Sequence, residues 1–233
     1  METLQGKTAV VLGGTGGVGE GIVKSLLSAG ATVVVPTRSE YKMRKLKSYI
    51  GEDLGKNLVV RVGSVNTEEN AGELAAYLMK TYKQIDLAVV SLGSWQEGYP
   101  LYSYPVHEWS RILQDNLTTH FLAIRTLVPL MNPKESYFFH INHFSAEEGY
   151  PLAGPMAMAA AAQKSLIQTL AKEVDKINIK VFELILGPLK TRDRLSQGAD
   201  QEDWHYPEDI GNIIRGMTRL GHQQDVVHYL LRR

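Results

Sequence analysis

The sequence predicts an α/β protein in which a doubly wound, mostly parallel sheet of seven strands lies between two layers of helices. Short runs rich in β-branched residues alternate along the chain with longer segments of helical periodicity, which is the pattern of βαβ crossovers. A cluster of glycines occupies the first strand-to-helix junction. Hydrophobic residues make up 44% of the 233 residues, so the chain can bury a sizeable core.

Seven short apolar runs are the candidate strands. They are TAVVLG (8–13), TVVVP (32–36), NLVVRV (57–62), DLAVVSL (86–92), YFFHI (137–141), IKVFELI (179–185) and VVHYLL (226–231). Helix-length segments between them include VGEGIVKSLLSAG (18–30), EENAGELAAYLMKTY (68–82) and SRILQDNLTTHFLAIRTLVPLM (110–131). No linker, repeat or low-complexity block interrupts this alternation, so residues 1–233 are predicted to form one domain.

One long irregular segment, RDRLSQGADQEDWHY at 192–206, follows the sixth candidate strand. In open α/β sheets, ligands bind in the loops at the carboxyl ends of the strands. We therefore expect this segment to be an irregular loop that shapes a substrate pocket.

The composition points to a small-molecule partner. Twenty-five basic residues balance twenty-five acidic ones, so no charged face for nucleic acid or for a membrane surface is predicted. Cysteine is absent, which excludes disulfides and thiol chemistry. The N-terminal segment lacks the pattern of a signal peptide, and no apolar run approaches the ~20 residues that span a bilayer. We expect a cytoplasmic protein.

The glycine cluster LGGTGGVGEG, at 12–21, is the strongest motif. It follows the first candidate strand and opens a helix, as a phosphate-binding loop requires. Glycines allow the tight turn and let backbone N–H groups approach a pyrophosphate closely. The alternative interpretation is a tight packing turn without a ligand.

The spacing of Gly13, Gly17 and Gly19 matches the TGxxxGxG loop of the short-chain dehydrogenase/reductase family, with Leu12 in place of the leading threonine. The resemblance continues in order through almost the whole chain. It implies a Rossmann-type, three-layer α/β/α fold with strand order 3-2-1-4-5-6-7, a single dinucleotide-binding domain over 1–233, and a nicotinamide cofactor.

The end of the second candidate strand favours NADP over NAD. An acidic residue there would bond the ribose 2′-hydroxyl of NAD, but the sequence has Thr37 and then Arg38. A guanidinium matches phosphate geometry, although Arg38 also fits a solvated surface position. Family motifs are eroded elsewhere: the adenine-facing pair becomes Ser64-Val65, NNAG becomes VSLG, and PGxxxT becomes LGPLKT. The resemblance implies the cofactor-binding set Gly13, Thr15, Gly16, Gly17, Val18, Gly19, Thr37, Arg38, Ser64, Val65, Gly93, Gly187 and Thr191.

The resemblance also implies four catalytic positions, and only one keeps the family residue. Family members use a Tyr as proton donor or acceptor, a Lys four residues later that lowers the Tyr pKa, a Ser thirteen residues before the Tyr, and an Asn in the preceding helix. LAKE at 170–173 matches the family's LAxE, which places Met156, Ala160 and His143 at the Tyr, Lys and Ser positions. Asn116 falls on the Asn position.

His143 is the candidate replacement for the missing acid, because an imidazole can polarise a carbonyl or deliver a proton near neutral pH. The alternative is a histidine that only hydrogen-bonds at the end of a strand. Lys164 and Tyr150 do not restore the usual proton relay from their sequence positions. A metal site on His140 and His143 is disfavoured, because no carboxylate or cysteine stands at ligand spacing.

Three functions follow. The first is an atypical NADP(H)-dependent oxidoreductase that acts on a small carbonyl or alcohol. The second is a catalytically silent NADP(H)-binding sensor or partner protein, and the third is dehydration or isomerisation in the same cleft. The alanine-rich head of the segment 154–173 permits close helix approach, so a homodimer or homotetramer is expected, as in the family.

Overall fold

In the computed structural model, which describes residues 4–219 and 225–232, seven strands form one fully parallel sheet. The strands are β1 (Thr8–Leu12), β2 (Thr32–Thr37), β3 (Leu58–Val62), β4 (Leu87–Val90), β5 (Ser136–His143), β6 (Ile179–Leu186) and β7 (Val227–Leu230). Their order is β3-β2-β1-β4-β5-β6-β7, which confirms the predicted order. Every predicted strand is present. The fourth is shorter than expected, because Ser91 and Leu92 have left the sheet and line a cavity.

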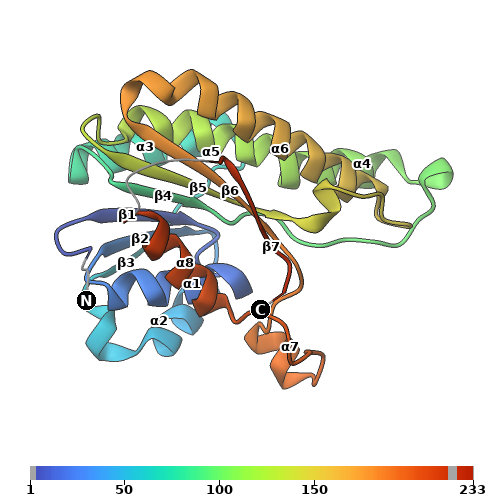
Figure 1. The fold of residues 1–233 in the computed structure, drawn as a ribbon, viewed down its shortest axis with the longest axis horizontal. Helices are drawn as coiled ribbons and strands as arrows, with labels where there is room; N and C mark the ends of the chain where they lie inside the picture. Colours follow the sequence, from blue (N-terminus) through green and yellow to red (C-terminus); the bar gives the residue numbers. More distant parts are fainter. Residues whose placement is uncertain (1–3, 220–224, 233) are drawn as a thin grey trace.

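Helices cover both faces of the sheet, as Figure 1 shows. One layer contains α1 (Gly17–Ser28), α2 (Glu40–Gly55) and α8 (Pro207–Met217). The other contains α3 (Glu68–Tyr82), α4 (Val106–Leu113), α5 (Thr119–Leu127) and α6 (Gly154–Val174). This is the predicted three-layer α/β/α architecture.

Two apolar cores fill the spaces between the layers, because alternate residues of the buried strands point to opposite faces. On β1, for example, Ala9 and Val11 join the core under α1 and α8, whereas Val10 and Leu12 join the core under α3, α5 and α6. The sheet is therefore packed against helices on both faces.

The segment 110–131 differs from the single helix that its periodicity predicts. It contains the end of α4, a π turn at Gln114–Thr118, α5, and a short 3-10 turn at Val128–Leu130. The π turn is centred on Asn116, whose Nδ2 donates to the Ile112 carbonyl at 3.1 Å. Turns of this kind inside helices occur frequently at functional sites.

The expectation of an irregular loop over 192–206 is wrong for its first third, where Arg192–Ser196 forms the short helix α7. The hydroxyl of Thr191 caps this helix by accepting the Arg194 N–H. Arg192 Nε donates to Glu20 on α1 at 2.6 Å, and Leu189 pairs with His205 in a parallel bridge. The segment is therefore fastened at both ends, which its polar composition does not reveal. No helix within the described ranges has the length and apolarity needed to cross a membrane.

Candidate active site and cofactor cleft

Two adjoining cavities lie at the carboxyl ends of the strands, where open parallel sheets bind ligands. The outer cavity, of about 500 Å³, extends over the ends of β1, β2 and β3. The inner cavity, of about 390 Å³, extends over β4, β5, β6 and the start of α1. The two share Gly16 and the segment 91–94, so they form one continuous cleft.

All fifteen residues predicted from the sequence line this cleft. The outer cavity holds Gly13, Thr15, Gly16, Thr37, Arg38, Ser64, Val65 and Gly93. The inner cavity holds Gly17, Val18, Gly19, Asn116, His143, Gly187 and Thr191, and it shares Gly16 and Gly93. Residues that are far apart in the chain are thus brought together at one edge of the sheet.

The glycine loop forms a cradle that leaves no room for a side chain at Gly13 or Gly19. Gly13 has φ +79°, and a Cβ there would lie 1.9 Å from the Ser91 carbonyl oxygen. A Cβ on Gly19 would lie 2.2 Å from the Gly13 carbonyl oxygen. The cradle leads into α1, whose first backbone N–H groups have no acceptor within the helix. This backbone surface fits the pyrophosphate of a dinucleotide.

The outer cavity is rich in cations beside the end of β2. Arg38 lines it and has no ion pair among the described residues. Lys42 lines it as well, one helical turn further along, and so does the Ser39 hydroxyl that caps α2. Sequence reasoning missed Lys42, although its spacing of four residues from Arg38 was visible. Two cations and a hydroxyl suit a phosphate group.

Asn116 acts as a connector between the elements around the inner cavity. Its Oδ1 accepts the Ser94 N–H at 3.2 Å, and its Nδ2 donates to Ile112 within the helix. Its backbone carbonyl accepts a hydrogen bond from the buried Gln163 side chain of α6. The Asn116 side chain is therefore bonded to backbone on both sides, which favours a positioning role over direct proton transfer.

His143 stands at the end of β5 and lines the inner cavity. Its Nδ1 accepts the Ser145 N–H at 3.2 Å, an orienting bond that the sequence did not show. The ring packs against Trp95, with centroids 4.8 Å apart. Burial, assisted by the positive charge of Arg194, lowers the pKa of His143 from 6.5 to about 4. The imidazole is therefore neutral at pH 7.

Apolar side chains of α6 also line the inner cavity. Met156 and Ala160, both buried, line it from α6, and Gln163 follows one turn later. Trp95 and Arg194 complete the lining from the loop after β4 and from α7. The cavity thus offers apolar side chains, a neutral imidazole, several carboxamides, and the opposite charges of Arg194 and Asp193.

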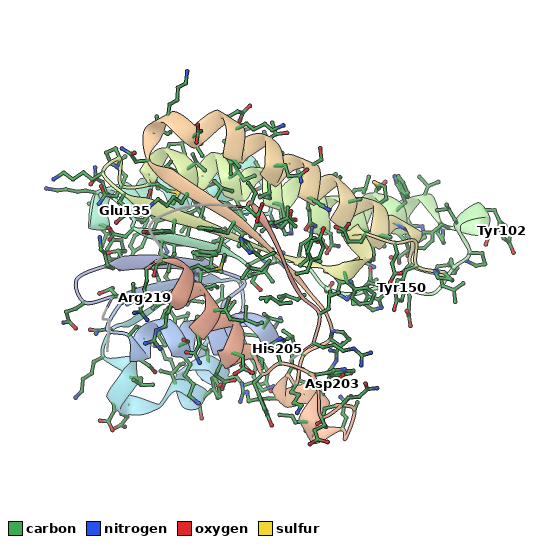
Figure 2. All side chains as sticks on the ribbon, in the orientation of Figure 1. Tyr102, Glu135, Tyr150, Asp203, His205 and Arg219 are labelled. Carbon is green, nitrogen blue, oxygen red and sulfur yellow. The ribbon has the colours of Figure 1, made fainter. Side chains whose placement is uncertain are left out.

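The other groups considered from the sequence lie outside the lining of this cleft. Tyr150 packs edge-on against Trp95 at 5.2 Å, near the projection that carries Tyr102 in Figure 2. Lys164 donates to Glu147 and, at 3.0 Å, to the Tyr229 hydroxyl of β7. Within the part of the chain that the structure describes, no cluster of three or more His, Cys, Asp or Glu residues could hold a metal ion.

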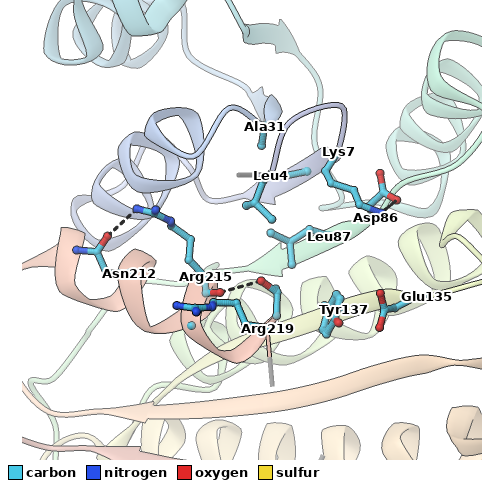
Figure 3. Close-up of a pocket in the computed structure, with 13 residues that line it drawn as sticks. Leu4, Lys7, Ala31, Asp86, Leu87, Glu135, Tyr137, Asn212, Arg215 and Arg219 are labelled. Atoms are coloured by element: carbon cyan, nitrogen blue, oxygen red, sulfur yellow. Dashed lines mark hydrogen bonds and ion pairs between the residues drawn. The ribbon is translucent and has the colours of Figure 1, made fainter. Parts of the chain in front are cut away.

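A larger cavity, of about 730 Å³, lies at the opposite edge of the sheet (Figure 3). It is lined by residues at the starts of the strands, among them Lys7, Asp86 and Tyr137. Lys7 Nζ pairs with Asp86 at 3.1 Å, and Asp86 also accepts the Thr8 N–H. Lys7 and Asp86 are already paired with each other, and parallel sheets bind their ligands at the carboxyl ends of the strands. We therefore assign the active site to the cleft.

The sheet order and the glycine cradle define a Rossmann-type α/β protein. The chain belongs to the short-chain dehydrogenase/reductase family of oxidoreductases: the family model described as enoyl-(acyl carrier protein) reductase matches residues 13–231. The 3-oxoacyl-(acyl-carrier-protein) reductase of Haemophilus influenzae is 30% identical, over 96% of this chain and 88% of that protein. An uncharacterized oxidoreductase of Staphylococcus aureus is 26% identical, over 95% of both chains.

Solved structures of the family share the fold. A metagenomic short-chain oxidoreductase in complex with NADP has a TM-score of 0.83 at 20% identity and covers 97% of both chains. A short-chain type dehydrogenase/reductase from Mycobacterium ulcerans has a TM-score of 0.88 at 18% identity, covering 100% of this chain and 92% of that one. At these identities the likeness concerns the fold alone.

Proposed function

We propose that this chain is an NADP(H)-dependent oxidoreductase with a non-standard active site, acting on a small carbonyl or alcohol substrate. The observation that carries the proposal is the continuous cleft, which unites the glycine cradle, the neutral His143, and Arg38, which has no ion pair among the described residues. A related structure was solved with NADP, which agrees with the cations at the end of β2.

In this proposal, different groups of cleft residues would bind different parts of the cofactor. Gly13 to Gly19 would hold the pyrophosphate, and Arg38 with Lys42 would bind the 2′-phosphate. Ser64 and Val65 would flank the adenine, and Gly187 with Thr191 would close the nicotinamide end. When bound, the nicotinamide supplies or accepts the hydride.

His143 polarises the substrate carbonyl. Because its Nδ1 accepts the Ser145 N–H, the neutral ring carries its hydrogen on Nε2 and can donate it to a carbonyl oxygen. The proton that completes the alcohol comes from water, since a neutral imidazole is a weak acid. Met156 and Ala160, which the sequence resemblance aligns with the family's Tyr and Lys, line the cavity with apolar groups and supply no proton.

NADPH consumption with a panel of small aldehydes and ketones tests this function, and His143→Ala is the matched variant. We expect turnover that falls on substitution while NADPH affinity, followed by tryptophan fluorescence, stays unchanged. Trp95 lines the cavity and serves as the reporter. NADPH binding without turnover of any carbonyl by the wild-type chain would contradict the proposal.

A silent NADP(H)-binding protein is the second candidate, and the apolar pair Met156 and Ala160 favours it. The double substitution Met156→Tyr/Ala160→Lys separates the two functions. Activity that arises only in the double variant supports the silent binder, whereas activity in the wild type supports the oxidoreductase. Isomerisation or dehydration by His143 is less well supported, because its Nδ1 lone pair is engaged and its Nε2 carries the hydrogen.

We further infer a homodimer or homotetramer formed through α5 and α6, which belong to the same helix layer in Figure 1. Phe121 on α5 is 50% exposed and Met158 on α6 is 36% exposed, beside the small residues of the α6 head. Large apolar side chains exposed on the helices of one layer are consistent with an interaction surface. The cytoplasmic location stays a prediction.

A further inference from the structure

A row of buried polar side chains crosses the apolar core beneath the inner cavity. It consists of Glu183 on β6, His140 and Asn142 on β5, and His120 on α5, all 6% exposed or less. Glu183 is 0% exposed. The neighbouring residues on the same face of the sheet, such as Phe138 and Val181, are apolar and form the core under α5 and α6. We call these four residues the buried row.

The members of the row contact one another in sequence. His120 Nδ1 and His140 Nε2 share a hydrogen bond of 2.8 Å. His140 Nδ1 lies 3.5 Å from Glu183 Oε1. The same carboxylate oxygen accepts a hydrogen bond of 2.7 Å from Asn142 Nδ2. The row thus runs from α5 through β5 to β6 and returns to β5 at Asn142.

Asn142 connects the row to the active site. Its Nδ2 also donates to the Ala160 carbonyl of α6 at 2.9 Å, and its Oδ1 accepts the His143 N–H at 2.8 Å. Both amide hydrogens and the amide oxygen are therefore used. Asn142, His143 and Ala160 all line the inner cavity, so this one carboxamide ties the strand that carries His143 to the helix opposite.

Burying these groups is costly. Glu183 Oε2 and His140 Nδ1 have no hydrogen-bond partner among the described residues. Burial lowers the pKa of His120 well below its ordinary value, so that ring is neutral. Apolar side chains of similar volume at such positions often give an equally stable or more stable core. A stability argument alone therefore does not explain the row.

We propose that Glu183 is a positioning residue of the active site: its Oε1 fixes the Asn142 carboxamide, and through it the placement of His143 relative to α6. His140 Nδ1 lies 3.5 Å from the same Oε1, and His120 hydrogen-bonds to the other nitrogen of the His140 ring. The proposal deepens the proposed function and rests on it for its kinetic consequences. Its structural consequence, the fixed His143 ring, stands without any activity.

Three variants test the proposal. The apolar triple variant His120→Leu/His140→Leu/Glu183→Leu keeps the core filled but removes the acceptor for Asn142. Glu183→Gln keeps an acceptor oxygen at the same position and is the rescue variant. Val181→Ala, at a fully buried position two residues earlier on the same face of β6, is the matched control for lost packing.

We expect the triple variant to melt no lower than Val181→Ala while its kcat falls about 10-fold, with KM and NADPH affinity within about 2-fold. Glu183→Gln should keep kcat within about 3-fold. Nitrogen NMR of the His143 ring gives a readout without turnover. The wild type, Glu183→Gln and Val181→Ala should show one Nε2–H tautomer, and the triple variant should show a mixture.

The proposal is overturned if the triple variant keeps the single His143 tautomer, or if Val181→Ala loses it to the same extent. It is also overturned if Glu183→Gln behaves like the triple variant, because the acceptor oxygen at position 183 would then not be what positions Asn142. If the wild type turns over no carbonyl, the proposed function fails, and the NMR comparison alone decides on Glu183.

Discussion

Nδ1 of His143 accepts a hydrogen bond from the backbone N–H of Ser145 at 3.2 Å. This contact decides what the ring can do, because an accepting Nδ1 leaves Nε2 as the only nitrogen that carries a hydrogen. Protonation of Nδ1 would break the contact and place a charge beside Arg194 in a half-buried site. The imidazole is thus held as a neutral donor.

The first prediction concerns the pH dependence of turnover. Because the pKa of His143 is lowered to about 4, the ring has the same charge throughout the neutral range. We expect kcat/KM for carbonyl reduction to show no step near pH 6.5. His143→Ala should lower kcat/KM about 100-fold at every pH between 6 and 9, since it removes one donor to the developing oxyanion. Initial rates with saturating NADPH measure this.

His143→Asn is the matched control for that experiment, because it retains a side-chain N–H donor. It should keep more activity than His143→Ala. A profile that falls with rising pH through 6.5 would mean that an imidazolium is the acid, and the neutral-donor role would then be wrong.

The second prediction concerns stability in acid. In the unfolded chain His143 has its ordinary pKa near 6.5, whereas in the folded protein the pKa is lowered to about 4. The unfolded chain therefore binds the proton more readily. The stability contributed by the neutral ring is present above pH 6.5 and is lost as the pH falls toward 4. After allowance for partial exposure, the loss is about 1–2 kcal/mol.

Urea unfolding of the wild type and of His143→Asn at pH 7 and pH 4.5 measures this loss. The free energy of unfolding should fall less between pH 7 and pH 4.5 in His143→Asn than in the wild type. The pKa of His120 is also lowered by burial, so acid should still destabilise both proteins to some extent. An equal loss of stability in the two proteins would contradict the contribution of His143.

The architecture was predictable because it depends on short-range patterns. Alternating apolar runs set the strands, and the glycine spacing led to the family and its strand order. The break at Asn116 was not predictable, since a π turn adds one residue without disturbing the apolar periodicity on either side. Helix α7 has five residues, which is too few for a periodic signal, although Thr191 is a good capping residue.

The residues that line the cleft were easier to predict than its chemistry. Gly13 has a positive φ, and Gly19 lies too close to the Gly13 carbonyl for a Cβ, so these glycines could be read directly from the sequence. The setting of His143 depends on a local turn and on Glu183, which stands 41 residues from Asn142. A carboxylate within the buried run IKVFELI was a visible signal of an unusual core, but its partners could not be read from one sequence.

The third prediction concerns cofactor choice. Arg38→Ala should raise the Kd for NADPH about 10-fold or more and leave the Kd for NADH unchanged, because only NADPH carries the phosphate that the guanidinium would bind. Lys42→Met should also raise the Kd for NADPH, but by a smaller factor. Tryptophan fluorescence titrations with both nucleotides measure this.

Arg44→Ala is the control for a general loss of positive charge. Arg44 lies in α2, as Lys42 does, but it pairs with Glu40 at 3.7 Å and does not line the outer cavity. It should affect neither nucleotide. If Arg38→Ala weakens NADH and NADPH equally, the preference for NADP is wrong.

The fourth prediction compares two glycines that both lie in helices. Gly19 in α1 faces the Gly13 carbonyl oxygen, which would lie 2.2 Å from an added Cβ, whereas Gly72 in α3 has nothing within 4 Å of that position. Gly19→Ala should therefore destabilise the protein by about 1–3 kcal/mol and weaken NADPH binding, because the cradle must shift. Gly72→Ala should stabilise it by about 0.5–1 kcal/mol, because alanine restricts the unfolded chain and strengthens the helix. Denaturant unfolding and NADPH titration distinguish the two, and a Gly19→Ala protein with unchanged NADPH affinity would show that the close approach to Gly13 does not serve the cofactor.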